Sequence, residues 1–441
     1  EEYQHALGQV WWKQVGALSQ WKFMGVDAQT DFYEREVAPV LKSGRKIAVI
    51  ISDALRYEAA QELSERIDRE SRFSTELNMQ YSVLPSYTQL GMAALLPHES
   101  LEFDSKDRLY VLADGRSTKG IEARNAILSD VGGKAIRYDD LIKLKVSEIK
   151  ELYKSCNVLY VYHNHIDAIG DAEKTESETV EACENTFKEL GEVVKKLASG
   201  NVYNMIITAD HGFLYQERDL NGAEWSSEQP KGDAVWVKKR RFAIGSNLAQ
   251  DHAFVTFTAA QVGISDPRDE GVSIQMPGSI ARFRMQGSGV RYVHGGAALQ
   301  EIVVPVLHVN KGRSAADDVR PVEFTILQRT DRLSSRQLTV EFLQNEPVGG
   351  KIRPRTVWAG LWGRDVKGGD VLISNETPVA FDLSGREKSE RHVTATLMLT
   401  SESERFNGMN IELRLREKTD GSNVLVMLDQ RARYFFKQGV V

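Results

Sequence analysis

Short runs of apolar residues alternate with amphipathic stretches in the first part of the chain. Residues 46–51, 157–162 and 203–208 are mostly apolar and rich in strand-forming side chains, which is typical of buried central strands. Amphipathic stretches at about 56–70 and at 174–197 predict helices between them. The alternation of strand and helix predicts an α/β domain with a largely parallel sheet.

The hydrophobic pattern divides the chain into three parts. Residues 1–42 carry apolar side chains at helical spacing and predict an N-terminal helical segment. The α/β pattern occupies residues 43–312, where the apolar stretch 302–307 is expected to return to the sheet as a late strand. Beyond it, short segments alternate apolar and polar residues between turn signals. Residues 319–441 are therefore expected to form a β-sandwich domain of immunoglobulin-like type.

Composition narrows the functional classes. The 441 residues are 41% hydrophobic and 27% charged, an ordinary globular balance, and the net charge of −6 gives no global attraction to nucleic acid. The two cysteines, Cys156 and Cys183, are too few for a disulfide framework. We find no secretory signal and no run long enough to span a bilayer, so a cytoplasmic protein without a membrane partner is expected. The chain starts without Met inside a helix-like pattern, which suggests a fragment of a longer protein.

Acidic and imidazole side chains lie near the ends of the predicted strands, where ligands bind in open α/β sheets. These candidate metal ligands are Asp53, Asp167, Asp171, Asp210, His211 and His294. Such an oxygen-rich set with imidazoles suits divalent zinc, manganese or magnesium. Each also has a structural interpretation: Asp53 as a helix N-cap, for example, or His294 as a turn residue beside two glycines. Taken together, the six favour a metal centre.

Three short motifs resemble a known family. Ser-Asp-Ala-Leu-Arg-Tyr-Glu at 52–58, Ala-Asp-His-Gly at 209–212 and His-Gly-Gly at 294–296 are similar to the PglZ domain of the alkaline phosphatase superfamily. The first motif is the specific one and looks closest to type A PglZ proteins of bacterial BREX phage-defence systems. The resemblance covers roughly residues 30–310, and the terminal sandwich also looks like the tail of those proteins. It implies an alkaline-phosphatase-like sheet flanked by helices, with other BREX defence proteins as partners.

The resemblance also implies roles for individual residues. Leu-Pro-Ser-Tyr-Thr-Gln-Leu-Gly at 84–91 is similar to the nucleophile motif of the superfamily and puts Thr88 at the nucleophile position. One ion would be held by Asp53, Asp210, His211 and the Thr88 oxygen. The other would be held by Asp167, Asp171 and His294. Because Asp171 stands where the superfamily usually has a histidine, that site is harder and could favour manganese or magnesium over zinc.

Several residues keep two interpretations. Ser86 is the alternative nucleophile. Arg56 would clamp a phosphate oxygen or, on a solvated helix face, pair with a neighbouring glutamate. His163 and His165 are either donors that support the metal ligands or structural histidines.

The predicted function is a metal-dependent phosphatase or phosphodiesterase, a nuclease among the alternatives, acting through Thr88 and two divalent ions, with zinc preferred. Lys-Lys-Arg-Arg at 238–241 lies between Trp236 and Phe242 and suggests a contact with DNA or another phosphodiester, although a solvated hairpin explains it equally well. A different class is a non-catalytic scaffold of a multi-protein defence complex, with metals stabilising the fold. The chain has no Gly-x-Ser-x-Gly elbow and no P-loop, which disfavours a serine hydrolase or a P-loop ATPase.

Overall fold

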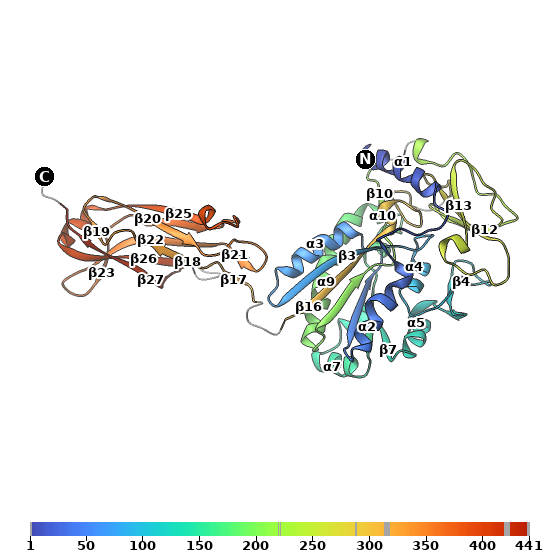
Figure 1. Cartoon of the computed structure of the whole chain (residues 1–441), viewed down its shortest axis with the longest axis horizontal. Helices are drawn as coiled ribbons and strands as arrows, with labels where there is room; N and C mark the ends of the chain where they lie inside the picture. Colours follow the sequence, from blue (N-terminus) through green and yellow to red (C-terminus); the bar gives the residue numbers. More distant parts are fainter. Residues whose placement is uncertain are drawn as a thin grey trace. The chain divides into compact units, whose positions relative to one another are not determined.

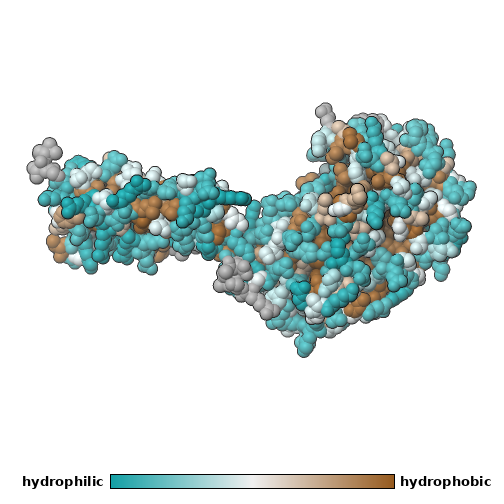
Figure 2. Space-filling model, viewed as in Figure 1, coloured by the Kyte–Doolittle hydropathy of each residue, from teal (hydrophilic) through white to brown (hydrophobic). Residues whose placement is uncertain are grey.

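The chain folds into two compact units in the computed structural model, which describes residues 2–218, 220, 222–286, 289–312, 318–418 and 424–438 (Figure 1). The first unit comprises Glu1–Asp68 and Phe73–Arg313, and the second comprises Arg69–Arg72 and Ser314–Val441. The N-terminal helical residues belong to the first unit. Among the described helices, none is long and apolar enough to cross a bilayer. Hydrophilic side chains cover most of the face seen in Figure 2.

A mixed sheet with strand order β1-β3-β16-β9-β2-β8-β7 forms the centre of the first unit. Its strands are β1 Asp27–Ala28, β2 Ile47–Ser52, β3 Phe73–Tyr81, β7 Gly133–Arg137, β8 Val158–His163, β9 Asn204–Thr208 and β16 Val303–Lys311. Strands β9, β2, β8 and β7 are parallel neighbours, whereas β16 is antiparallel to both β3 and β9. Because β16 starts where the other strands end, the segment before it lies at their carboxyl edge.

Helices cover both faces of this sheet. In β2, Ile47, Val49 and Ile51 pack into one apolar cluster, while Ala48 and Ile50 pack into another on the opposite face, as the strand period of two requires. The first cluster includes α2 Ala38–Lys42, α4 Thr88–Ala94 and α5 Gly120–Ser129. The second includes α3 Tyr57–Asp68, α7 Val146–Lys154 and α9 Thr179–Ser199. The other α-helices among the described residues are α1 Glu2–Gly16, α6 Tyr138–Leu141, α8 Ile166–Gly170 and α10 Leu299–Ile302.

Smaller sheets flank the carboxyl edge of the central sheet. One antiparallel sheet has the order β11-β12-β14-β13, and another has the order β4-β5-β6. Their strands are β4 Leu101–Phe103, β5 Val111–Ala113, β6 Arg116–Ser117, β11 Ala234–Lys238, β12 Ala243–Ser246, β13 Phe254–Thr258 and β14 Val272–Pro277. A short antiparallel pair joins β10 Leu214–Tyr215 to β15 Tyr292–Val293. This pair brings the segment after His211 beside the segment before His294.

The second unit consists of two antiparallel sheets around one apolar core. One sheet has the order β18-β20-β25; the other has the order β19-β27-β26-β22-β23, with β24 also beside β22 and the short end pair β19-β27 parallel. The strands are β17 Arg320–Pro321, β18 Phe324–Leu327, β19 Arg332–Leu333, β20 Gln337–Gln344, β21 Ile352–Arg353, β22 Arg355–Arg364, β23 Asp370–Leu372, β24 Thr377–Phe381, β25 His392–Met398, β26 Met409–Lys418 and β27 Leu425–Phe436. Strands β17 and β21 form a separate parallel pair.

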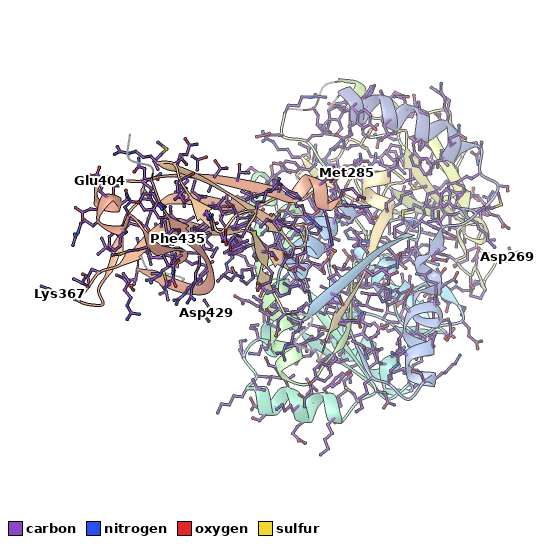
Figure 3. The ribbon with its side chains drawn as sticks, turned by 60° about the vertical axis from the view of Figure 1, so that its left-hand side comes forward. Asp269, Met285, Lys367, Glu404, Asp429 and Phe435 are labelled. Atoms are coloured by element: carbon purple, nitrogen blue, oxygen red, sulfur yellow. The ribbon has the colours of Figure 1, made fainter. Side chains whose placement is uncertain are left out.

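Phenylalanines join the two sheets of the second unit. The ring of Phe324 in β18 stacks on that of Phe381 in β24 with centroids 4.3 Å apart, and Phe342 in β20 meets Phe381 edge-on. Polar side chains such as Lys367 and Glu404 instead project outward (Figure 3). The predicted fold class, an α/β sheet flanked by helices and followed by a β-sandwich, is confirmed.

Candidate metal centre and active site

Two aspartates follow neighbouring parallel strands at the same level. The register of β2 and β9 pairs Ile51 with Thr208, so Asp53 and Asp210 each lie two residues beyond this pair. Both carboxylates are buried, with exposed fractions of 2% and 0%. Strand adjacency therefore brings together two acidic groups that are far apart in the sequence, as the strand-end argument predicted.

Asp53, Asp210 and His211 form the first group of candidate ligands. Their ligand atoms lie within 4.8 Å of one another, and Nε2 of His211 is 3.5 Å from both Asp53 Oδ1 and Asp210 Oδ2. These two oxygens are buried and have no hydrogen-bond partner among the described residues. Burial and the neighbouring Asp210 raise the pKa of Asp53 well above its ordinary value. A divalent cation between these atoms would supply both the missing partner and the missing positive charge.

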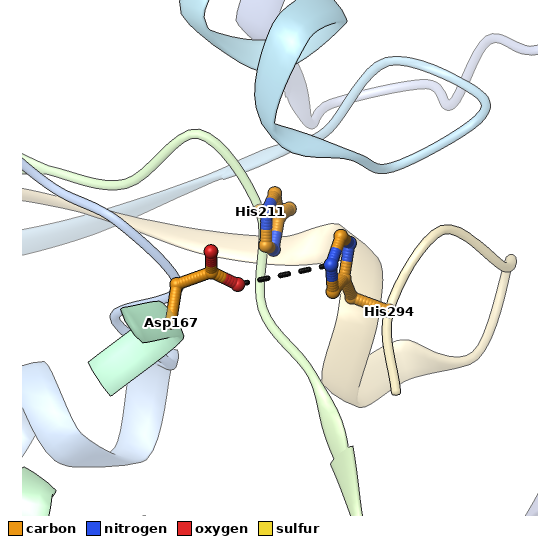
Figure 4. Close-up of side chains that lie close together, drawn as sticks. All are labelled: Asp167, His211 and His294. Atoms are coloured by element: carbon orange, nitrogen blue, oxygen red, sulfur yellow. Dashed lines mark ion pairs between the residues drawn. The ribbon is translucent and has the colours of Figure 1, made fainter. Parts of the chain in front are cut away.

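Asp167, His211 and His294 form the second group (Figure 4). The His294 Nε2 atom lies 3.7 Å from Asp167 Oδ1, and the His294 ring stacks on His211 with centroids 4.2 Å apart and an interplanar angle of 7°. Burial, followed by the nearby His211, lowers the pKa of His294 to about 4. The imidazole is therefore neutral at pH 7, which is the form that binds metals.

Hydrogen bonds fix the orientation of these ligands. The Nδ1 atom of His211 lies 2.9 Å from the Gly212 carbonyl oxygen, which only accepts, so Nδ1 carries the proton and Nε2 keeps its lone pair. The Tyr292 hydroxyl donates to Asp167 Oδ1 at 3.0 Å. Tyr292 is 2% exposed, and its ring packs against Gly170, where a Cβ atom would approach within 2.5 Å. Such supporting contacts are typical of metal sites.

Thr88 lies at the start of α4 with its hydroxyl 3.1 Å from Nε2 of His211. The helix approaches the first ligand group closely because residue 91 is glycine. A Cβ atom at Gly91 would lie 2.2 Å from the backbone oxygen of Asp210. Ser86, the alternative nucleophile, is fully buried and donates its hydroxyl to the Gly296 carbonyl at 2.6 Å. Of these two hydroxyls, Thr88 is therefore the one within hydrogen-bond distance of a candidate ligand.

Gln29 connects the Thr88 segment with the Asp210 segment. Its side-chain amide donates to the carbonyl oxygens of Ala209 and Asp210 at 3.0 and 2.8 Å. Its carbonyl oxygen accepts the backbone N–H of Val83 at 3.2 Å. Gln29 is fully buried, so these bonds are shielded from water and hold the two segments in register.

Two other predicted site residues lie outside both ligand groups. Asp171 lines the same cavity as Asp167, and burial, with Asp167 second, raises its pKa. The Arg56 guanidinium pairs with Glu58 and lies 5.2 Å above the Phe213 ring. Arg56 lines a pocket other than the two that include Thr88, and it makes the ion pair that was one of its two interpretations; its role as a phosphate clamp stays a prediction.

His163 and His165 share Glu189. The Nε2 atom of His163 lies 2.8 Å from Glu189 Oε2, and Nδ1 of His165 lies 3.1 Å from Oε1. The other nitrogen of His163 contacts the Ser52 hydroxyl at 3.0 Å. His163 is therefore held next to the residue that precedes Asp53, and both histidines line the same cavity.

The basic run 238–241 does not form one exposed surface. Arg241 is fully buried and makes a two-pronged ion pair with Glu301, at 3.0 and 2.7 Å. Glu301 also accepts the backbone N–H of Gly296 at 2.9 Å, so the pair fixes the loop after His294. Of the four basic residues, only Lys238 and Lys239 are exposed. The four basic residues therefore do not form the compact exposed cluster expected from the sequence. The sequence does not reveal that Arg241 pairs with the buried Glu301.

Two cavities meet at Thr88 and Gln89. The first, of about 330 Å³, is lined by Asp167, His294 and Lys239 among others, and the second, of about 500 Å³, includes Asp53 and Arg124. Each candidate ligand group thus opens toward its own cavity. The Thr88 hydroxyl thus lies beside His211, which belongs to both candidate ligand groups, and Thr88 lines both cavities.

Residues 32–309 match the family model described as the BREX system PglZ alkaline phosphatase-like domain. The chain belongs to the PglZ family. It is 38% identical over 391 residues to the alkaline phosphatase-like protein BrxZ of Escherichia coli O9:H4 (strain HS). It is 35% identical over 388 residues to the alkaline phosphatase-like protein PglZ of Bacillus cereus (strain H3081.97). Each alignment covers 86% of this chain and 44% of the relative, so the chain spans less than half the length of these relatives.

The family match confirms the resemblance to the PglZ domain that the three sequence motifs indicated. The PglZ domain is also similar in fold to murine ectonucleotide pyrophosphatase/phosphodiesterase 5, with a TM-score of 0.41 and 12% identity over 60% of this chain and 88% of that chain.

Sequence reasoning about this PglZ domain missed Gln29, Arg124 and Tyr292. Each is an isolated polar residue in a segment without a motif, and each acquires its partners only through tertiary packing. The one available signal was the position of Tyr292, two residues before a candidate histidine.

Proposed function

We propose that the chain is a metal-dependent phosphoryl-transfer hydrolase, a phosphatase or phosphodiesterase, that acts in BREX phage defence. Asp53, Asp210 and His211 would hold one divalent ion, and Asp167 and His294 would hold the other. The observation that carries the proposal is the Thr88 hydroxyl 3.1 Å from His211 Nε2, beside two buried carboxylate oxygens that have no hydrogen-bond partner among the residues that the structure describes.

The residues have complementary tasks in this proposal. Divalent ions, when bound, lower the pKa of a hydroxyl and offset the charge of a phosphoryl group. Thr88 Oγ1 would release its proton to solvent and form a bond to phosphorus while the bond to the leaving oxygen breaks, and that oxygen would take up a proton from solvent. Water would then cleave the phosphothreonine ester, which releases the phosphate group and restores the Thr88 hydroxyl. Gln29 and Gly91 keep Thr88 close to Asp210 throughout, so the hydroxyl needs no rearrangement to reach its partner.

We infer zinc as the preferred ion in the first group because two carboxylates and a neutral imidazole are common catalytic zinc ligands. Asp171 lines the cavity of the second group and adds negative charge to it. That charge leaves manganese or magnesium as alternatives in the second group.

The test is hydrolysis of p-nitrophenyl phosphate and bis-p-nitrophenyl phosphate by the metal-stripped chain after addition of zinc or manganese. Turnover that requires the metal and disappears in Thr88→Ala supports the proposal, and the ratio of the two rates separates monoesterase from diesterase. Plasmid DNA is a further substrate in the same assay. An absence of turnover with either metal would leave the scaffold hypothesis as the better account.

The defence role has its own test. Asp210→Ala with His211→Ala is introduced in cells that carry the defence system, and phage plating is compared with the unaltered system. Loss of protection with unchanged protein level supports an enzymatic role, whereas full protection favours a scaffold.

A further inference from the structure

The second cavity has a positively charged wall. It opens from Thr88 and Asp53 and extends past α5 and the end of β8. Two arginines line it, Arg124 from α5 and Arg137 from the end of β7. Neither arginine lines the first cavity. This arginine pair therefore lies on one side of Thr88 only, while Lys239 and Arg240 line the first cavity.

Arg124 is held rigidly in this wall. Its side chain is 8% exposed, Nε donates to the Thr118 carbonyl at 3.0 Å, and the guanidinium lies 4.9 Å above the Tyr162 ring. These contacts engage one edge and one face of the guanidinium and fix its direction before any ligand arrives. A buried, preoriented guanidinium is the side chain best suited to bind a tetrahedral anion with two parallel hydrogen bonds.

The negative groups of the same cavity have partners of their own. Glu189 is shared between His163 and His165. Asp53 belongs to the first ligand group and would be neutralised by its ion. The exposed side chain of Asp139 is the further carboxylate among the described lining residues. With Asp53 assigned to its ion, the two arginines match the two remaining carboxylates, Asp139 and Glu189, and the buried Arg124 is the cation held rigidly in this cavity.

We propose that the second cavity is a subsite for a second phosphate group of the substrate, one linkage away from the reacting phosphoryl group. Arg124 would bind this second phosphate directly, and the exposed Arg137 would contact it from the rim. This subsite rests on the proposed function, because Thr88 defines where the reacting group lies. A substrate with a single phosphate would fill the centre and leave Arg124 without an anion.

The experiment compares two inhibitors of p-nitrophenyl ester hydrolysis by the metal-loaded chain: methylphosphonate with one anionic group, and methylenebisphosphonate with two. We expect the bisphosphonate to bind about tenfold more tightly, because one charge-assisted contact contributes about 1.4 kcal/mol. Arg124→Lys keeps the positive charge but loses the parallel N–H donors of the guanidinium, and Arg137→Met loses the charge. In both variants the ratio by which the bisphosphonate binds more tightly than methylphosphonate should shrink. Inhibition by methylphosphonate stays within about twofold, since the reacting group does not touch these residues.

Arg45→Met is the matched control. Arg45 is exposed, bonds Ser43 and precedes β2 at the opposite edge of the sheet. Removal of metal by the bisphosphonate affects all variants equally, so the difference between variants reports the subsite. Shifts of the melting temperature with each inhibitor give a second measurement that needs no turnover.

Equal ratios of the two inhibition constants in Arg124→Lys, Arg137→Met and Arg45→Met would overturn the subsite while leaving the proposed function intact. An equal loss of affinity for both inhibitors in Arg124→Lys would also overturn the subsite, because Arg124 would then contact the reacting group. A chain without turnover would refute the proposed function instead, and a bisphosphonate-specific melting shift lost in Arg124→Lys would still support an anion site.

Discussion

The Thr88 hydroxyl and the His211 imidazole face each other at 3.1 Å across the carboxyl edge of the sheet. Since Nδ1 of His211 is committed to the Gly212 carbonyl, Nε2 presents a lone pair to the hydroxyl. The same nitrogen faces Asp53 Oδ1 at 3.5 Å. The hydroxyl is therefore oriented toward the point where a cation would bind.

Replacement of Thr88 provides the direct test of this orientation. Thr88→Ala is expected to lower kcat by at least about 10³-fold, because the bond-forming oxygen is removed. Thr88→Ser keeps that oxygen and should retain measurable turnover. Ser86→Ala is the control, since Ser86 bonds the Gly296 carbonyl rather than a candidate ligand. A larger loss in Ser86→Ala than in Thr88→Ala would identify Ser86 as the nucleophile.

The close contact at Gly91 should be intolerant of one extra carbon. Gly91→Ala would place a Cβ atom 2.2 Å from the Asp210 backbone oxygen, so α4 must shift away from the first ligand group. Because misplacement by about 1 Å can cost roughly 10²-fold in rate, we expect at least that loss of kcat.

Gly191→Ala in α9 is the matched substitution, because nothing lies within 4 Å of its added carbon. It should raise the unfolding free energy by about 0.5–1 kcal/mol through helix propensity and leave turnover unchanged. Equal activity of the two variants would show that α4 can move without consequence.

The buried aspartate pair should destabilise the metal-free chain. Burial raises the pKa of both Asp53 and Asp210 above their ordinary values. The raised pKa values lower the free energy of unfolding. This loss is absent below about pH 4, where the carboxyls of the unfolded chain are protonated, and it grows as the pH rises toward the folded pKa values. Asp210→Asn removes one charge and keeps an acceptor for the Ala54 N–H. It should therefore raise the melting temperature at pH 7 by a few degrees, about 2–4 °C per kcal/mol.

Addition of zinc should reverse this order. Binding to the native state alone stabilises the unaltered chain by about 2.7 kcal/mol at one hundred times the dissociation constant. Asp210→Asn lacks one candidate ligand, so zinc should stabilise this variant less than the unaltered chain. Melting curves with zinc and with a chelator measure both effects, and an identical zinc response in the two proteins would argue against Asp210 as a ligand.

Cys183 should react slowly with alkylating reagents. Burial, with smaller contributions from neighbouring acidic groups, raises the pKa of its thiol to about 11. In a Cys156→Ala variant, the rate with iodoacetamide should keep rising by about tenfold per pH unit from about pH 8 to 10, because the thiolate fraction keeps growing. In the urea-unfolded chain the rate should reach half of its maximum near pH 8.5, the ordinary thiol pKa, and level off above about pH 9.5. A plateau near pH 9 in the folded chain would contradict the raised pKa.

The sequence indicates which candidate ligands lie near one another where chain position determines spatial position, although His211 rather than Asp171 lies beside Asp167 and His294. Asp53 and Asp210 directly follow apolar runs, and parallel strands place such residues at one edge. The strand that follows His294 was predicted too, and its antiparallel direction puts His294 at that same edge.

The supporting residues could not be predicted in this way. Gln29 precedes the site by a long stretch of chain, and only packing shows that its amide bonds the Asp210 backbone. Arg241 belongs to a basic run that resembles a surface patch, yet Glu301 accompanies it into the interior. Long-range pairing of this kind leaves no periodic trace in one sequence.

Membership of His211 in both ligand groups has a stoichiometric consequence. Its Nδ1 is occupied by a carbonyl, so only one lone pair remains to be shared between two positions. In the proposed two-ion centre, the ion that binds first would take that lone pair, and the second would be left with the remaining donors of its group. Loading of the proposed pair would therefore be stepwise, with a stronger and a weaker stage, and a singly loaded protein would be a distinct chemical species.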